Sequence, residues 1–269
     1  MKPQMNILAA LALCALSCTV MPTAASGAEE AIATDRPDFV ESSKVVGKGR
    51  IQLETSFALE RDARDGNRDR TYTTPTLLRL GVSDSLELRL ETDGIVRLRR
   101  DDAGVRTSQR GYADASFGLK WHAQDGDETT NRPGIAWLMH VDADTGSRAF
   151  RGHGLRPSLR MVAEWELPSG YSVGVMPGVS MERNDIGRRY AAGILAAVVG
   201  KTLTERSRGF VELAGQQFAS AENGGNLVTL DVGFAYLLTD SVQIDTAVSR
   251  GLNNRTPDRG WTLGLSVRF

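Results

Sequence analysis

The residues best placed to do chemistry are charged side chains spaced two positions apart within apolar stretches. In the stretch LELRLET, Glu87, Arg89 and Glu91 alternate with leucines. Side chains two positions apart on a β-strand point to the same face, so this spacing gathers carboxylates and a guanidinium on one side. Such a face can attract ions and polar solutes, or its charges can pair with one another.

Residues typical of covalent or metal chemistry are sparse. The chain has three histidines, His122, His140 and His153, and none stands two positions before a serine. No histidine pair has the spacing of metal ligands on one face, and the Asp-rich stretches lack the calcium-loop pattern. We therefore expect no catalytic residue, no bound metal ion and no cofactor.

The overall composition excludes some partners. The 269 residues include 32 Lys and Arg against 33 Asp and Glu, giving a formal charge of −1. Without a basic excess we expect no nucleic-acid partner. After residue 28, the longest apolar run is 191–200, about half of the ~20 residues that a membrane helix needs.

Residues 1–28 have the pattern of a secretory signal peptide. Lys2 precedes an apolar run over 7–20, and small residues fill 24–28. Lipidation at Cys18 is an alternative, although Ala15 stands where a lipoprotein signal usually has leucine. Cys14 and Cys18 are the only cysteines, so a mature chain beginning at Glu29 cannot form a disulfide.

The rest of the chain repeats segments of about ten residues in which apolar and polar side chains alternate, each followed by a break. In LVTLDVGFAYLL, for example, Val228, Leu230 and Val232 share one face, and Asp231 lies on the other. This pattern predicts about twelve strands, near 50–60, 71–81, 86–98, 111–122, 134–142, 154–167, 171–182, 189–202, 208–218, 226–237, 242–250 and 261–269.

The connections alternate between short turns, such as 82–85 and 239–241, and longer polar loops, such as 61–70 and 99–110. The connection over 123–133 is a long exception among the short turns. An even strand count with both termini on the short-turn side is typical of an outer-membrane barrel, with short periplasmic turns and longer extracellular loops. A soluble β-sandwich shares the alternation but buries its apolar face. We therefore predict an all-β, closed antiparallel transmembrane β-barrel over residues 49–269.

The closing stretch WTLGLSVRF fits this hypothesis. Trp261 and Phe269 lie at its ends, where aromatic rings suit the lipid interfaces, and Leu263 and Leu265 lie between them. A terminal aromatic residue such as Phe269 is common in these barrels, so we expect the barrel-assembly machinery and outer-membrane lipid as partners. The backbone of a closed barrel has no unpaired edge, which hydrocarbon requires.

With the lipid face assigned, the opposite positions should line the interior. They carry charges of both signs, which either form a solute pathway or pair across the interior and fill it. The candidate pore-lining and plug residues are Asp35, Arg36, Asp38, Glu54, Arg79, Glu87, Arg89, Glu91, Asp114, Lys120, His140, Arg156, Arg160, Glu164, Glu212, Asp231, Asp245 and Arg268.

Residues 29–48 precede the first strand, and we expect them on the periplasmic side. Two roles remain open for this segment. It folds into the lumen as a plug, with Arg36 meeting wall carboxylates such as Glu54, or it is a plain N-terminal tether.

Three stretches carry a resemblance to a known family. The first is TDRPDFVESSKVVGKGRIQLETSF at 34–57, the second is GYADASFGLKW at 111–121, and the third is the closing region from 237 to 269. They resemble the outer-membrane proteins called "putative MetA-pathway of phenol degradation". Trp121 and His122 depart from the family pattern, where a tyrosine and a basic residue are more usual. The resemblance implies a closed barrel that passes small solutes, with hydrophobic or aromatic compounds as candidates.

These observations favour an exported outer-membrane channel that passes small solutes by passive diffusion. Two other classes remain: a lipase-like enzyme built on an outer-membrane barrel, and a sealed barrel with a structural or surface role. Single-channel conductance distinguishes a channel from a sealed barrel, because a sealed barrel gives no current steps.

Overall fold

The computed structural model describes residues 30–64, 66–184 and 186–269. The predicted signal peptide, its cut site and Cys18 lie outside these ranges. Residues Ala31–Phe269 form one structural unit. No helix in these ranges is long and apolar enough to cross a membrane.

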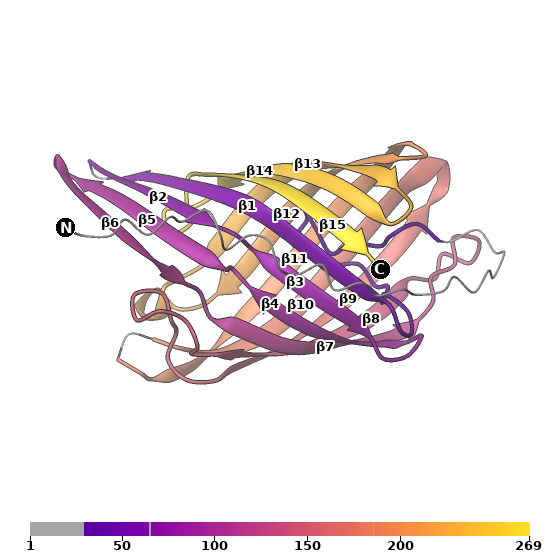
Figure 1. The fold of residues 1–269 in the computed structure, drawn as a ribbon, viewed down its shortest axis with the longest axis horizontal. Helices are drawn as coiled ribbons and strands as arrows, with labels where there is room; N and C mark the ends of the chain where they lie inside the picture. Colours follow the sequence, from indigo (N-terminus) through magenta and orange to yellow (C-terminus); the bar gives the residue numbers. More distant parts are fainter. Residues whose placement is uncertain (1–29, 65, 185) are drawn as a thin grey trace, which may run out of the picture. The chain divides into compact units, whose positions relative to one another are not determined.

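The alternating segments form one antiparallel sheet (Figure 1). Its strands are β1 (Ile51–Arg64), β2 (Asn67–Thr73), β3 (Thr76–Gly81), β4 (Leu86–Thr92), β5 (Ile95–Asp102), β6 (Val105–Tyr112), β7 (Ala115–Gln124), β8 (Gly134–Ala143), β9 (Arg156–Leu167), β10 (Tyr171–Arg183), β11 (Arg189–Thr204), β12 (Ser207–Phe218), β13 (Leu227–Thr239), β14 (Val242–Gly251) and β15 (Arg259–Arg268). Two-residue interruptions separate β2 from β3, β4 from β5 and β6 from β7, so each of these pairs forms one strand of the wall. Counted in this way, the barrel has twelve strands, as the sequence predicts.

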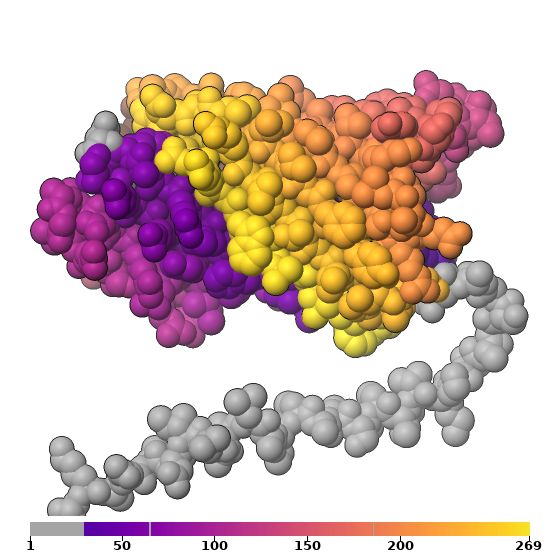
Figure 2. Space-filling model, turned by 90° about the horizontal axis from the view of Figure 1, so that it is seen from above, coloured from indigo at the N-terminus to yellow at the C-terminus, as the bar shows by residue number. Residues whose placement is uncertain are grey.

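The first and last strands close the barrel. β15 pairs with β1 over ten residues, with Leu53 opposite Val267. Beyond this ladder, the N–H of Ile51 donates to the carbonyl of Phe269 at 3.2 Å, and the N–H of Phe269 donates to the carbonyl of Ile51 at 2.8 Å. Figure 2 shows the two ends of the barrel chain side by side, indigo against yellow. Closure satisfies backbone groups that would otherwise meet lipid unpaired.

The wall strands show the predicted alternation of outward apolar side chains and inward polar ones. On β15, Leu263 and Leu265 are exposed, whereas Ser266 and Arg268 on the other face are buried. On β13, Phe234 is exposed and Ala235 is buried. An exposed apolar face around a closed sheet is the lipid-facing band of a transmembrane barrel.

Two regions expected to be polar loops, 61–70 and 99–110, are instead paired strand. β1 and β2 stay paired as far as Arg64 and Asn67, and β5 and β6 extend to a turn at Ala103 and Gly104. Ala103 and Gly104 have positive φ, 47° and 89°, as a two-residue hairpin turn requires. The prediction was wrong because these strands rise above the lipid, where both faces are polar and the alternation disappears.

The remaining connections keep the predicted division. On the periplasmic side the 3₁₀ turn η1 (Pro168–Gly170) joins β9 to β10, and residues 205–206 and 240–241 are tight turns. The longer periplasmic exception contains an isolated bridge between Asp127 and Arg132. The opposite rim carries the loops 144–155, 184–188, 219–226 and 252–258, of which 219–226 includes the 3₁₀ turn η2 (Ala221–Asn223).

The interior of the barrel has two unlike sides. Strands β1, β3, β4 and β7 direct charged and amide side chains inward, and these are almost fully buried. Strands β8 to β12 direct apolar side chains inward beside their charged ones. Among the apolar residues, Leu138, Met176 and Val198 pack with Val40 and Phe39 of the N-terminal segment. Residues 30–50 form no strand and lie between these two sides.

Candidate functional site

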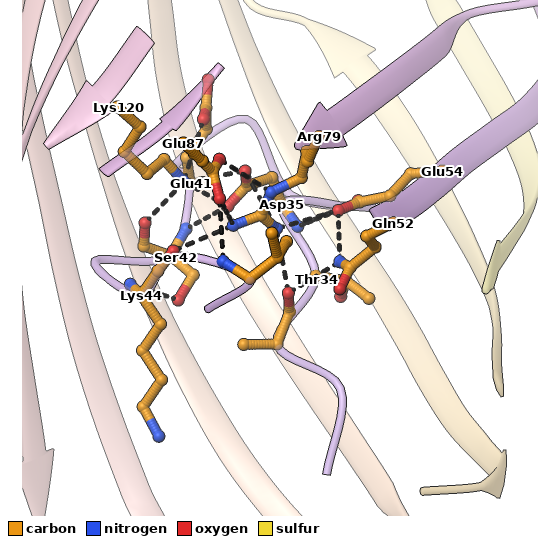
Figure 3. A network of polar contacts seen from close by, with 12 residues as sticks. Thr34, Asp35, Glu41, Ser42, Lys44, Gln52, Glu54, Arg79, Glu87 and Lys120 are labelled. Carbon is orange, nitrogen blue, oxygen red and sulfur yellow. Dashed lines mark hydrogen bonds and ion pairs between the residues drawn. The ribbon is translucent and has the colours of Figure 1, made fainter. Parts of the chain in front are cut away.

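Asp35 lies at the centre of a buried ionic network in the lumen (Figure 3). Its carboxylate accepts hydrogen bonds from Nζ of Lys120 at 2.7 Å and from a terminal nitrogen of Arg89 at 2.6 Å. A terminal nitrogen of Arg79 lies 3.3 Å away. One carboxylate of the N-terminal segment therefore contacts three cations, which come from β3, β4 and β7.

The wall supplies carboxylates that balance these cations. Nε of Arg79 donates to Glu87 at 2.8 Å, and its terminal nitrogen donates to Glu54 at 3.0 Å. Arg89 lies 2.9 Å from Glu87 and 2.7 Å from Glu41 of the segment. Taking ions out of water costs several kcal/mol each, so such a cluster is stable only when every charge is paired.

Burial alone would raise the pKa of Asp35, but Arg79, Lys120 and Arg89 outweigh it and hold that pKa well below its ordinary value. Asp35 is therefore ionised at neutral pH. Its charge matches the surplus of cations that the wall presents at this point.

Four wall carboxylates accept hydrogen bonds from the backbone of the N-terminal segment. Glu212 accepts from the N–H groups of Phe39 and Val40 at 2.8 and 2.6 Å. Glu164 accepts from the N–H of Ser43 at 3.1 Å and from its hydroxyl at 3.0 Å.

The other two acceptors are Glu87, for the N–H of Val46 at 2.9 Å, and Glu54, for the N–H of Asp35 at 3.0 Å. These bonds replace a β-ladder, because buried N–H groups require a partner. The segment is thus attached to β1, β4, β9 and β12 through side chains of the wall.

Further contacts fix the middle of the segment. Asp38 forms an ion pair with Arg208 at 2.7 Å. The guanidinium of Arg160 lies 5.7 Å from the ring centroid of Phe39, and its terminal nitrogen is 3.5 Å from Glu41. Phe39 and Val40 turn toward the apolar side of the lumen. The apolar residues of the segment thus face apolar residues of the wall, and its acidic residues face cations of the wall.

A cavity of about 740 Å³ adjoins the segment. Its lining includes Phe39 and Pro37 of the segment and, from the wall and loops, Phe150, Glu91 and Arg160. Aromatic and apolar surface is therefore combined there with charged groups. A site with this lining can bind a small solute that has both an apolar body and polar substituents.

The predicted lining residues fall into three groups. Asp35, Glu54, Arg79, Glu87, Arg89 and Lys120 meet in the network, with His140 accepting a hydrogen bond from Nε of Arg89 at 3.2 Å. Asp38, Glu164, Glu212 and Arg160 contact the segment or belong to it. The remaining predicted residues lie elsewhere in the interior: Arg36, Glu91 and Asp231 in the cavity lining, Asp114 and Arg156 in an ion pair of 2.9 Å, and Asp245 and Arg268 buried on β14 and β15.

Arg36 faces wall carboxylates other than Glu54. It lies in the cavity lining, where it interacts electrostatically with Asp93 and Asp245, and no ion pair with Glu54 is found among the described residues. Glu54 instead accepts from the N–H of Asp35, from Gln52 and from Arg79. Arg36 and Asp35 point to different sides of the segment. Alternation within the strands could not predict this, because the segment is not a strand.

Sequence reasoning missed several residues of the site. Arg208, the partner of Asp38, lies on the inward face of β12, two positions before Phe210. The apolar inward residues of β8 to β12 were missed because those strands are apolar on both faces, as in AAGILAAVVG at 191–200. Alternation gives no signal in such a stretch.

The described residues do not form the arrangement of a hydrolase site or a metal site. The chain contains one Gly-x-Ser-x-Gly pentapeptide, at residues 170–174, the spacing of a hydrolase nucleophile elbow. Its Ser172 lies inside β10, directly after a turn, whereas an elbow joins a strand to a helix. His122 contacts the carbonyl of Ser43 and Asp125, and His140 contacts Arg89. Within the described ranges, no cluster of His, Cys, Asp and Glu could hold a metal ion.

Fold and lumen together define a transmembrane β-barrel of the outer-membrane type. The sequence profile of the family described as "Putative MetA-pathway of phenol degradation" matches residues 34–269, which is most of the chain. The protein belongs to this family. None of the curated proteins matches the chain significantly.

Solved structures agree with this fold. The COG4313 outer membrane channel from Pseudomonas putida F1 superposes with a TM-score of 0.65 at 11% identity, covering 85% of this chain and 98% of that one. The KdgM porin gives 0.52 at 11% identity, covering 81% and 99%. The β domain of the Bordetella autotransporter BrkA gives 0.52 at 14% identity, covering 82% and 99%. These proteins are described as a channel, a porin and an autotransporter domain, and not as enzymes.

Proposed function

We propose that this protein is a passive outer-membrane channel for small solutes whose lumen is closed by residues 31–50. We call this part of the chain the plug segment. The observation that carries the proposal is the attachment of the segment: its backbone and acidic side chains bind groups from β1, β3, β4, β7, β9 and β12. A tether that only precedes the first strand would need none of these contacts.

A ring of wall charges suits a channel, because it attracts solutes and also holds a movable gate. The plug segment has no strand of its own. Its displacement breaks side-chain contacts and a few backbone hydrogen bonds near its ends, such as Ile32 to Asp240 and Gly49 to Gly81, and leaves the ladders between wall strands intact. Solutes would reach the plug from the 740 Å³ cavity. Release of the segment then opens a path along the charged side of the lumen.

Family membership and the mixed lining of the cavity support small aromatic or hydrophobic compounds with polar substituents as the solute class. Phe39 and Phe150 provide aromatic surface, while Arg160 and Glu91 provide charge. Such a channel needs no enzymatic step and no cofactor. Phe269 at the end of the closing strand suits recognition by the barrel-assembly machinery.

Single-channel recording in planar bilayers tests this function. The wild-type chain should show infrequent current steps, and Asp35→Asn should open more often, because the neutral amide no longer balances Arg79, Arg89 and Lys120. Arg148→Gln is a matched control, because Arg148 is an exposed residue of the loop 144–155. Absence of steps in wild type and in Asp35→Asn would favour a sealed barrel instead.

A further inference from the structure

Five arginines form one row across adjacent strands on the outer surface of the barrel. The strand register places them opposite one another in the order Arg250, Arg259, Arg61, Arg70 and Arg99, on β14, β15, β1, β2 and β5. All five are exposed. Neighbouring strands are about 4.8 Å apart, so this arginine row spans about 19 Å.

The arginine row lies directly above an aromatic belt. Two positions along each strand, toward the periplasmic side, the register aligns Trp261 with Leu59 and Leu59 with Tyr72. Phe57 packs against both rings, with centroids 6.4 Å from Trp261 and 6.0 Å from Tyr72. Aromatic belts mark the boundary between lipid and water. The arginines are therefore at the level of the lipid headgroups, on the extracellular side.

The carboxylate nearest to the row on the same face is that of Asp101, two positions beyond Arg99, and it pairs with Arg106 at 3.2 Å. None of the five arginines has an ion pair within the parts of the chain that the structure describes. Arg99 lies 5.6 Å from the ring centroid of Tyr72, a contact that does not neutralise its charge. The nearby Asp69 lies on the opposite face, where it pairs with Arg100 at 2.7 Å.

Like charges directly opposite one another destabilise a sheet. Here Arg61 faces Arg259 on one side and Arg70 on the other, and Arg70 also faces Arg99. A row of this kind is most stable when an external anion with several charges bridges its members. Guanidinium groups bind phosphate through paired hydrogen bonds, which makes phosphate a favourable partner.

We propose that the arginine row binds the phosphate groups of lipid A, the phosphorylated glycolipid anchor of lipopolysaccharide in the outer leaflet. The headgroup phosphates meet the guanidinium groups, while the acyl chains lie against the apolar band below, at Leu59, Val248 and Leu263. This site is on the outer surface of the wall, so it acts independently of any solute pathway through the lumen. It would fix the depth and orientation of the barrel in an asymmetric membrane.

Binding of purified lipid A to the mature chain in detergent tests the proposal. The triple variant Arg61→Gln, Arg70→Gln, Arg99→Gln should bind bisphosphorylated lipid A at least about tenfold more weakly than wild type, because each guanidinium near a lipid surface contributes about 1 kcal/mol. The control Arg148→Gln, Arg151→Gln, Arg188→Gln removes the same charge from extracellular loops and should bind like wild type. Dephosphorylated lipid A should bind wild type as weakly as the phosphorylated form binds the row variant.

The outcomes separate the possible sources of binding. Equal affinity of wild type for the phosphorylated and dephosphorylated lipids would overturn the proposal, because acyl contacts alone would then explain binding. Displacement of lipid A by an equal concentration of inorganic phosphate would also overturn it in favour of a free-anion site. Unchanged circular dichroism and channel conductance in the row variant establish that the barrel is intact. If the triple variant does not fold, the single changes Arg61→Gln and Arg70→Gln give the same comparison.

Discussion

Lys120 and Asp35 lie 85 positions apart in the chain, yet the ammonium group of Lys120 is 2.7 Å from both carboxylate oxygens of Asp35. Both side chains are almost completely buried. The same ammonium group donates to the carbonyl of Ser42 at 2.9 Å, so it holds the plug segment at two points. This lysine is the one cation of β7 that connects the wall to the segment.

Replacing Lys120 by methionine keeps the length of the side chain but removes its charge. Asp35 and Glu41 then lose a buried partner, and breaking a buried ion pair on one side typically costs about 3 to 5 kcal/mol. We expect the free energy of unfolding, measured by urea titration in phospholipid vesicles, to fall by this order. Lys48→Met is the matched control, because Lys48 is exposed near the end of the segment. An equal effect of both changes would argue against the network.

Acidification should remove the contribution of Asp35 to plug closure only at low pH. The pKa of Asp35 is lowered in the folded state, so the stability that it contributes is fully present above the unfolded pKa of about 3.9 and is lost as pH falls toward the folded value. We therefore expect the difference in open probability between wild type and Asp35→Asn to stay constant between pH 7 and about 4.5. A fall of this difference within that range would contradict the assignment of Asp35 as the anchor.

The wall was predictable from sequence because lipid imposes a strict rule on it. Every strand within the membrane must direct apolar residues outward, and Leu263, Leu265 and Phe234 follow this rule. The inward positions of the charged residues Arg79, Glu87 and Arg89 follow from the same rule, because successive side chains on a strand point to opposite faces. Both the strand count and the charged side of the lumen could therefore be inferred without a structure.

The path of the plug segment could not be inferred in this way. The N–H of Ser43 binds Glu164, which is 121 positions away, and the N–H of Val40 binds Glu212, which is 172 positions away. The periodicity of a single strand carries no information about such distant contacts. The extended ends of β2, β5 and β6 were also missed, because strands above the membrane have water on both faces. Alternation of apolar and polar residues identifies a strand only where one face meets lipid or an apolar core and the other meets a polar environment. Where both faces meet the same environment, the alternation disappears and the strand is missed.

Gly118 provides a test of how closely the charged side of the lumen is packed. A Cβ added at Gly118 would collide with the imidazole of His140, which accepts a hydrogen bond from Arg89. Gly118→Ala should displace that ring and destabilise the barrel by about 1 to 3 kcal/mol, the usual cost of overpacking. At Gly193 on β11 the nearest atom to an added Cβ is the Cβ of Phe218 at an ordinary 3.5 Å. Gly193→Ala should therefore be tolerated, and equal losses for both variants would argue against the close packing at His140.

Arg160 should influence which ions pass through the lumen. Its guanidinium lines the cavity next to Phe39 and is only partly buried, so it adds positive charge where a solute approaches the plug segment. Arg160→Ala should make the open channel several-fold more selective for cations, measured as a shift of the reversal potential in a salt gradient. Leu263→Ala alters only the lipid-facing band and should leave the reversal potential unchanged. Because Arg160 also contacts Glu41, the variant should open more often as well. A change in opening without a change in selectivity would place Arg160 among the contacts of the plug and outside the solute path.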